Sequence, residues 1–264
     1  MKYQDIENVY FSVGGIKIHP VQIPDVVEIM TQWINEKVLG NYIVVSNAND
    51  AVLSNKDKSV KNAVNASSLS VPDGFSMVLL GRVFGYPLKN RVYGPDLMLE
   101  FLDQSQKSGF SHYFYGATDT INDLMIKNLR SKFPLLKIAG SFAPPFRQLS
   151  EDEKIRVIDS INYAGPDVLW IGLGCPKQQL WMHEFSDKLN VPVMVGVGAA
   201  FDFVAGTKSQ APKWMQKSGL EWFYRLATEP TRLWKRYLIG NTVFIWLCIK
   251  EIFKTKIRGK TSAV

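Results

Sequence analysis

Short apolar runs alternate with helical stretches over the first 206 residues, and this alternation limits the possible folds more than any other feature of the chain. Six runs have the length and apolar content of buried strands: 42–46, 69–71, 112–115, 136–140, 168–172 and 193–197. Strands that alternate with helices form parallel sheets whose two faces are both covered. We therefore predict an α/β domain over residues 1–206, with a Rossmann-like, mostly parallel sheet and helices on both faces.

Three of the intervening helices carry end signals. Gly94-Pro95 opens one helix that Gly109 stops, and a second covers Thr118–Lys132. A third begins with a capping box, in which Ser150 is followed three residues later by Glu153.

The pattern changes at residue 207, after which helical stretches rich in Trp, Tyr, Arg and Lys follow without a strand signal. Residues 207–264 hold 12 Lys and Arg against 3 Asp and Glu, a net charge of +9, whereas the first 206 residues carry −2. Such an asymmetry indicates an anionic partner, which could be nucleic acid, a phosphate ligand or an anionic membrane. We predict that residues 207–264 form a basic, aromatic-rich helical appendage.

Other features limit the compartment and the cofactors. No stretch reaches the roughly 18 apolar residues that span a bilayer, and the N-terminus lacks the pattern of a signal peptide. Two cysteines, Cys175 and Cys248, are too few for a disulfide framework, and no Cys/His cluster has zinc-ligand spacing. There is also no Asp-x-Asp motif to hold a divalent metal on a diphosphate. We expect a cytoplasmic protein that needs no metal or other cofactor.

Ligands of open α/β sheets bind beyond the carboxyl ends of the strands, so we searched the segments that follow the predicted strands. A glycine turn at 172–177 precedes a helix start, where Gly172, Gly174 and Lys177 could hold a diphosphate. A tight turn with a surface lysine explains the same residues. The turn lacks the third glycine of the dinucleotide fingerprint.

Three further segments carry polar side chains that could either contact a ligand or cap a local structure. Asp73 could accept a proton from an attacking hydroxyl, or it could cap a turn before Gly74. Residues 46–50 could hydrogen-bond a sugar or a base, or cap the helix that starts near Asn49. Asp202 could contact a ligand, or bond to backbone N–H groups as a buried cap.

The appendage contains three arginines, Arg225, Arg232 and Arg236, at spacings of seven and four residues. They would share one face of a continuous helix, but Pro230 is expected to interrupt it. Arginine suits diphosphate because its donors form a planar fork. The neighbouring aromatic residues are typical of an interfacial helix, although an amphipathic helix packed on the domain has the same pattern.

Several motifs, taken together in order and spacing over about residues 40–240, resemble glycosyltransferase family 26, the WecG/TagA/CpsF family. The motifs are Pro72-Asp73-Gly74-Phe75, Arg91, Gly94-x-Asp96-Leu97-Met98, Gly172-Leu-Gly-Cys-Pro-Lys-Gln178, Val197-Gly-Ala-Ala-Phe-Asp-Phe-Val-Ala-Gly206, Ala211-Pro-Lys-Trp214, Gly219-Leu-Glu-Trp222, Arg225, Glu229-Pro230, Arg232 and Arg236-Tyr237. The chain departs from the family at two places. The family's Thr-x-Asn reads Ser46-Asn-Ala-Asn49, and its Lys-Gln-Glu reads Lys177-Gln-Gln179.

The resemblance implies an inverting, metal-independent transfer of a hexose-type sugar, with N-acetylmannosamine our first expectation, from a UDP-sugar to a polyprenyl-diphosphate-linked sugar in the synthesis of a cell-surface polysaccharide or teichoic acid. It places the enzyme at the inner face of the bacterial membrane, bound to anionic lipid through the appendage. Asp73 takes the position of the family's general base, and Ser46 is expected beside it as a second catalytic residue. The expected substrate-binding residues are Asn47, Asn49, Arg91, Asp96, Gly172, Gly174, Lys177, Gln178, Asp202, Arg225, Arg232 and Arg236.

Other functions remain open from the residues alone. A non-enzymatic protein that binds nucleic acid or membrane would explain the basic tail, but not the polar clusters after the strands. An NAD-type oxidoreductase would fit the sheet, but not the missing glycine fingerprint. The tail could also be a contact in a homo-oligomer. We expect no nucleic acid partner.

Overall fold

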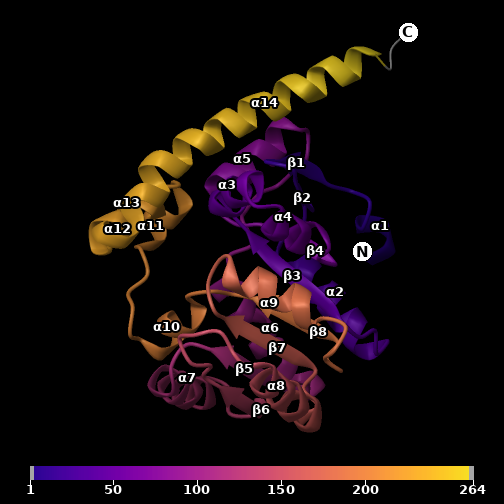
Figure 1. Ribbon diagram of the computed structural model, residues 1–264, viewed down its shortest axis with the longest axis vertical. Helices are drawn as coiled ribbons and strands as arrows, with labels where there is room; N and C mark the ends of the chain where they lie inside the picture. The colour runs from indigo at the N-terminus through magenta and orange to yellow at the C-terminus, as the bar shows by residue number, and fades with distance from the viewer. Residues whose placement is uncertain (1–2, 262–264) are drawn as a thin grey trace.

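The computed structural model describes residues 3–261, and six of its strands form one parallel sheet (Figure 1). These strands are β3 (Asn41–Ser46), β4 (Leu69–Pro72), β5 (Ser111–Gly116), β6 (Lys137–Phe142), β7 (Val168–Gly172) and β8 (Val193–Gly196). Their order across the sheet is β4-β3-β8-β7-β5-β6, and all neighbours are parallel. The predicted parallel α/β sheet is confirmed, with small shifts at the strand ends.

The inner strands β3, β8, β7 and β5 are mostly apolar because their side chains alternate between two hydrophobic cores, whereas the edge strand β6 is partly exposed. On β7, Val168 and Trp170 belong to one core, whereas Leu169 and Ile171 belong to the other. The first core is covered by α2 (Ile23–Asn35), α6 (Gly94–Ser108), α7 (Asp119–Lys132) and α10 (Ala200–Ala205). The second is covered by α3 (Ala48–Lys56), α4 (Lys58–Asn65), α5 (Phe75–Val83), α8 (Glu151–Ala164) and α9 (Lys177–Phe185).

The expected helix ends are confirmed by their local geometry. Gly109 ends α6 in the left-handed conformation, and Thr118 caps α7 by accepting from the Ile121 N–H. Ser150 and Glu153 form the predicted capping box of α8.

An N-terminal hairpin was not predicted from the sequence. After the short helix α1 (Tyr3–Ile6), the strands β1 (Phe11–Val13) and β2 (Ile16–Ile18) pair antiparallel around Gly14-Gly15. Both glycines have positive φ, of 61° and 82°, which the tight turn requires. The hairpin packs its apolar side chains into the second core.

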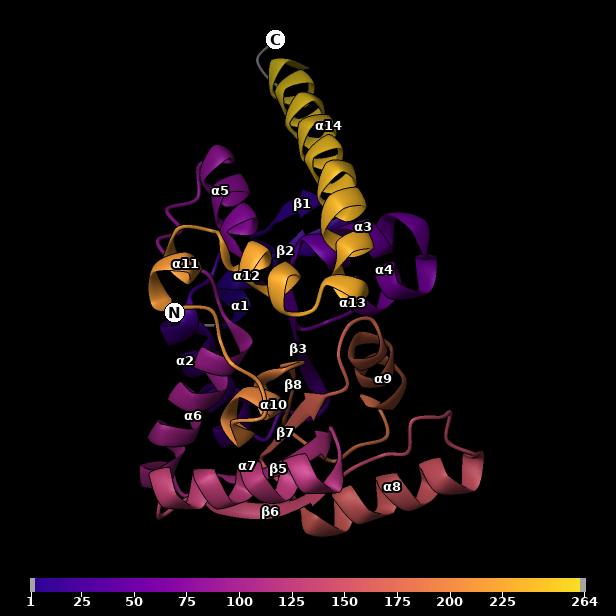
Figure 2. The same ribbon diagram turned by 90° about the vertical axis from the view of Figure 1, so that its left-hand side faces the viewer.

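The C-terminal residues are helical, as predicted, and break at the expected proline. The elements are α11 (Lys213–Lys217), α12 (Glu221–Thr228), α13 (Pro230–Trp234), a π-helical turn η1 (Lys235–Ile239) and α14 (Gly240–Thr261). The long helix α14 contacts α3 and β1, and it runs along the end of the molecule opposite to β6 (Figures 1 and 2). Within residues 3–261, no helix combines the length and the apolar character needed to cross a bilayer.

Candidate active site

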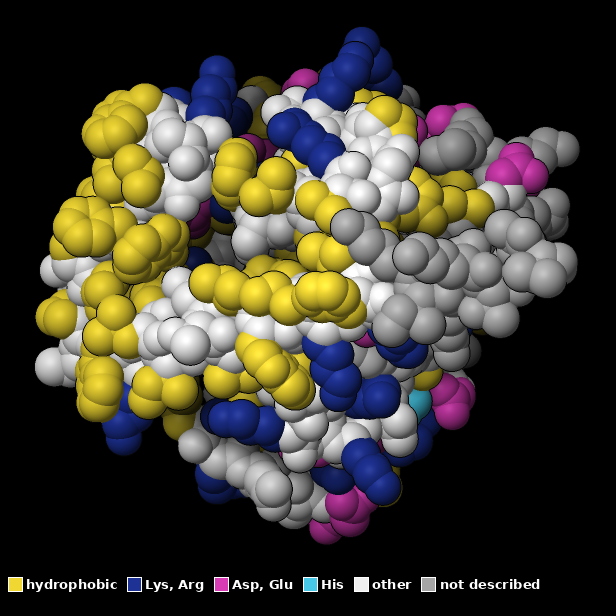
Figure 3. Space-filling view, turned by 90° about the horizontal axis from the view of Figure 1, so that it is seen from above, with side chains coloured by type: hydrophobic (Ala, Val, Ile, Leu, Met, Phe, Trp, Pro, Cys, Tyr) yellow, Lys and Arg dark blue, Asp and Glu magenta, His cyan; other side chains and the backbone are white. Residues whose placement is uncertain are grey.

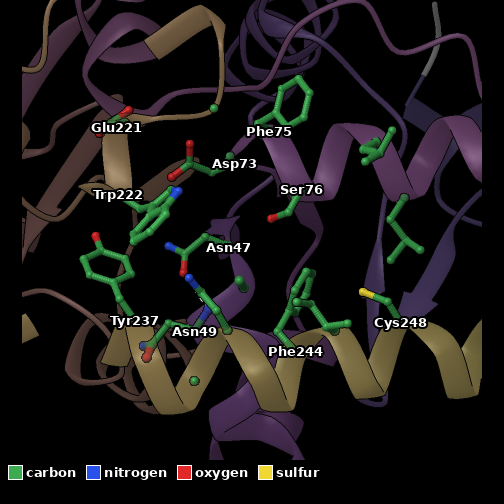
Figure 4. Close-up of a pocket in the computed structure, with 18 of the residues that line it drawn as sticks. Asn47, Asn49, Asp73, Phe75, Ser76, Glu221, Trp222, Tyr237, Phe244 and Cys248 are labelled. Carbon is green, nitrogen blue, oxygen red and sulfur yellow. Dashed lines mark hydrogen bonds between the residues drawn. The ribbon is translucent and has the colours of Figure 1, made fainter. Parts of the chain in front are cut away.

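A cavity of about 500 Å³ lies between the carboxyl ends of β3 and β4, the helix α5, and the C-terminal helices (Figure 4). Its charged side chains lie near the strand ends and on α12 and η1, and most of its apolar side chains lie on α5 and α14. The C-terminal helices therefore form part of the wall of the cavity.

Asp73 lies at the polar end of this cavity, directly after β4. Its backbone N–H donates to the Ser46 carbonyl over 2.8 Å, which holds the residue beside the end of β3. The next residue, Gly74, has a φ of 94°, so the chain turns into α5 through a conformation that favours glycine. The buried Oδ1 atom of Asp73 accepts no hydrogen bond from any described residue.

The surroundings of Asp73 favour proton uptake. Burial, opposed by Arg91 and assisted by Glu221, raises the pKa of Asp73 to about 6. A carboxyl group with this pKa is ionised at neutral pH and is still a better proton acceptor than an exposed aspartate. The geometry and the pKa both suit a general base.

Arg91 connects Asp73 to the appendage. Its Nη1 lies 3.7 Å from Asp73 Oδ1, and its Nη2 lies 2.5 Å from Oε2 of Glu221, the first residue of α12. The guanidinium also stacks on the ring of Tyr93, at 4.0 Å. Glu221 was not among the predicted site residues, although the Gly219-Leu-Glu-Trp222 motif contains it.

A second polar group forms at the start of α3. Asn47 caps this helix, and its Oδ1 accepts from the Asn49 N–H over 3.0 Å and from Arg236 Nη2 over 3.4 Å. Asn49 in turn donates from Nδ2 to Cys175 Sγ over 3.3 Å. The capping interpretation of this segment is confirmed for Asn47, and because Asn47 and Asn49 also line the cavity, their contact with a ligand stays a prediction.

Asp50 lies fully buried beneath this group. It accepts from the Asn47 N–H, from the Cys175 thiol and from the Gln179 side-chain amide. Burial raises the pKa of Asp50, and the nearby Arg236 opposes this rise. The departure at position 179 now has a physical reason: a glutamine can donate to Asp50, whereas an ionised glutamate there would repel it.

Other predicted site residues lie outside the cavity. The hydroxyl of Ser46 is fully buried and lies 2.7 Å from the Ser70 hydroxyl, so it faces the neighbouring strand. Gln178 is buried, and its Oε1 accepts from the N–H groups of Gly174 and Gly198, 3.1 Å each, which ties two glycine turns together. Lys177 is exposed at the start of α9.

The remaining predicted residues divide in the same way. Arg225 and Arg236 line the cavity, whereas Arg232 is exposed and pairs with Glu229 at 2.6 Å. Asp202 pairs with Lys208 at 3.2 Å, and Asp96 lies in the first turn of α6. The structure thus brings together six of the predicted residues: Asn47, Asn49, Asp73, Arg91, Arg225 and Arg236. It does not bring Ser46, Asp96, Gly172, Gly174, Lys177, Gln178, Asp202 or Arg232 into the same wall.

A second hollow, of about 340 Å³, adjoins the first. It lies between α12 and the segment after α10, and Lys208 and Tyr224 line it. Glu221 and Arg225 border both hollows. Across the described part of the chain, no three His, Cys, Asp or Glu side chains are grouped so that they could hold a metal ion.

Comparisons with known proteins identify the family of the chain. Residues 11–258 match the model of the glycosyl transferase WecG/TagA/CpsF family. An N-acetylglucosaminyldiphosphoundecaprenol N-acetyl-beta-D-mannosaminyltransferase of Bacillus subtilis is 31% identical over 206 residues, which are 78% of each chain. An enzyme of the same name from Staphylococcus aureus is 28% identical over 233 residues, 88% of this chain and 87% of its own. The chain therefore belongs to the WecG/TagA/CpsF family of glycosyltransferases.

Proposed function

We propose that this enzyme transfers N-acetylmannosamine from its UDP-sugar to N-acetylglucosaminyl-diphospho-undecaprenol, a step of teichoic acid synthesis. The observation that carries the proposal is the Asp73 carboxylate, whose buried Oδ1 has no hydrogen-bond partner among the described residues and faces a cavity with one polar and one apolar end. The names of the relatives supply the two sugars and the lipid.

In the proposed reaction, Asp73 takes the proton of the acceptor sugar hydroxyl while the hydroxyl oxygen attacks the anomeric carbon. The bond from that carbon to the UDP oxygen breaks in the same step, so the configuration inverts. General-base assistance is typically worth about 10²–10⁴-fold, and the positioning of the two substrates adds to it. The two adjoining hollows offer space for two substrates.

The leaving UDP acquires negative charge that the site must stabilise. Arg225 lines both hollows, so it can approach the diphosphate of UDP from either one. The enzyme is proposed to need no metal, because this arginine supplies positive charge to the leaving group. It is also proposed to work on the inner face of the membrane, held there by the appendage.

The test is a transfer assay with N-acetylglucosaminyl-diphosphate-polyprenol and a panel of UDP-sugars, with and without EDTA, that measures both UDP release and the extended lipid. Product from UDP-N-acetylmannosamine alone, unchanged by EDTA, is expected. Product from another donor would correct the sugar, and loss of product in EDTA would refute metal independence. Absence of both UDP release and UDP binding by folded protein would refute the proposal.

A further inference from the structure

The apolar end of the cavity is a groove between α5 and α14. On α5, Phe75, Leu79 and Val83 leave 46%, 49% and 56% of their surface exposed. On α14, Ile245 and Ile249 are 58% and 48% exposed and face the same space. Large apolar side chains that line a cavity and remain exposed indicate an apolar ligand.

The groove and the polar site are parts of one cavity. In Figure 4, Asn47 lies between Asp73 and α14, and Phe244 and Cys248 point from α14 toward α5. Arg236 approaches the same Asn47, at 3.4 Å. One cavity therefore holds a proton acceptor, an arginine and apolar walls.

We propose that this groove binds the first isoprene units of the lipid-linked acceptor, outside the bilayer, with the acceptor diphosphate beside Arg236 and the acceptor sugar at Asp73. The inference rests on the proposed function, since it assigns a place to the lipid of that acceptor. A ligand with a reactive sugar, a diphosphate and a linear run of apolar isoprene units brings one matching group to each of these parts of the cavity. A partner helix or a second copy of the chain would fill the apolar end but would bring no group to Asp73.

The faces of α14 support this assignment. Ile245, Cys248, Ile249 and Ile252 are spaced by three and four residues, so they form one stripe along the helix, and all of them line the cavity. Trp246 and Phe253, 54% and 63% exposed, lie outside that lining. The same helix therefore presents one stripe to the groove and another to its surroundings.

The surface around the groove has the side chains of a membrane-contacting surface. Seen from the α14 end, hydrophobic side chains gather over this face, with Lys and Arg side chains among and around them (Figure 3). A surface of this kind is typical of proteins that lie on anionic membranes. An isoprenoid that leaves the bilayer would enter the groove without crossing water.

The experiment compares two water-soluble acceptors without membrane or detergent: N-acetylglucosaminyl-diphosphate carrying either a farnesyl or a methyl group. The wild-type enzyme should show a KM for the farnesyl acceptor at least about tenfold lower than for the methyl acceptor. Leu79→Ser and Ile249→Ser should each raise the farnesyl KM about 5- to 30-fold, because each removes one apolar wall. Neither should change the KM of the UDP-sugar or the kcat/KM of the methyl acceptor.

The matched control is Ile239→Ser, since Ile239 is 53% exposed in η1 and does not line the cavity. It should leave the farnesyl KM unchanged. Equal KM values of the wild type for the two acceptors, or equal increases in Ile239→Ser and Ile249→Ser, would overturn the inference. A photoreactive farnesyl diphosphate should label α5 or α14 in the wild type and label Ile249→Ser less, and labelling elsewhere would also overturn it.

Failure of the proposed function would look different. In that case folded wild-type enzyme would transfer sugar to neither acceptor, and the groove assignment would be lost with the function. Transfer to both acceptors without a chain-length preference would leave the function intact and refute the groove alone.

Discussion

Asp73 and Glu221 share one arginine, although they lie 148 positions apart in the chain. Because Arg91 lies 2.5 Å from Glu221 and 3.7 Å from Asp73, its charge is directed mainly to the appendage carboxylate. Burial raises the pKa of Asp73 to about 6, although the neighbouring Arg91 opposes this rise. Glu221 acts here as a positioning residue for Arg91.

Replacement of the proposed base should affect the chemical step rather than substrate binding. Asp73→Asn should lower kcat about 10²–10⁴-fold, because an amide cannot accept the hydroxyl proton. UDP binding, measured by calorimetry, should stay within about twofold. The matched control is Asp202→Asn, which removes a carboxylate outside the cavity, and unchanged kcat in Asp73→Asn would exclude the base role.

The pH dependence of kcat/KM should depend on how Arg91 is shared between Asp73 and Glu221. The base works only when ionised, so kcat/KM should fall as the pH drops through about 6. Glu221→Gln removes a nearby negative charge and leaves Arg91 free to approach Asp73, and both changes lower the pKa of Asp73.

The acid limb of the Glu221→Gln profile should therefore move to lower pH. Glu229→Gln, which breaks an ion pair outside the main cavity, should leave the limb in place. A shift of equal size in both variants would show that the loss of any negative charge nearby, rather than the position of Arg91, moves the acid limb of kcat/KM.

A substitution at position 179 tests why this chain has a glutamine where the family has a glutamate. Gln179→Glu would place a second carboxylate against buried Asp50, so one of the two must take up a proton or the pair must separate. We expect a loss of about 2–4 kcal/mol in the free energy of unfolding at pH 7, measured in urea, that becomes smaller at pH 5. Lys177→Glu, at an exposed neighbouring position, should change stability by no more than about 0.5 kcal/mol.

At the scale of elements, the sequence allowed prediction of features that depend on short-range patterns. Most of the strands were predictable because they are apolar and buried, whereas β6 is partly exposed. Local chemistry sets two helix ends, with Ser150 at the start of α8 and Gly109 at the end of α6. The β1–β2 hairpin was missed because each strand has only three residues, although Gly14-Gly15 between apolar alternations is a hairpin signal.

Site residues were predictable only to the extent that their position in the chain determines their contacts. Asp73 and Asn47 follow strands that pair directly, so their proximity follows from the parallel sheet. Ser46 is the last residue of β3, and strand alternation turns its side chain toward Ser70. The contact of Glu221 with Arg91 joins residues 130 positions apart, and no local pattern predicts it.

The inner face of α14 should contribute to stability as well as to the cavity. Leu247 is 3% exposed and belongs to the second core, so Leu247→Ala should cost about 2–4 kcal/mol in the free energy of unfolding. Leu238→Ala makes the same change at a residue that is 58% exposed, and it should cost no more than about 0.5 kcal/mol. Chemical denaturation of both variants checks this, and equal values would mean that α14 is not packed on the domain.

At the scale of the whole molecule, positively charged and exposed aromatic side chains occur together on the C-terminal helices. Lys235 lies over the ring of Trp234 at 5.4 Å, and Lys250 lies over Trp246 at 5.1 Å. Both tryptophans are about half exposed, at 44% and 54%. An indole at the headgroup level beside a lysine is a common membrane anchor, because the ring is amphipathic and the cation attracts anionic lipid.

The proposed membrane contact can be tested on these two pairs without disturbing the active site. Combined Trp234→Ala and Trp246→Ala should weaken binding to vesicles with anionic lipid at least about tenfold in a sedimentation assay, and higher salt should weaken wild-type binding. Tyr163→Ala removes an aromatic ring that is 96% exposed on α8, at the other end of the molecule, and should leave binding unchanged. Transfer to the water-soluble farnesyl acceptor should persist in the double variant, because neither tryptophan lines the cavity. Full vesicle binding by that variant would place the membrane contact on another surface, whereas loss of both binding and transfer would show that the two tryptophans support the active site itself.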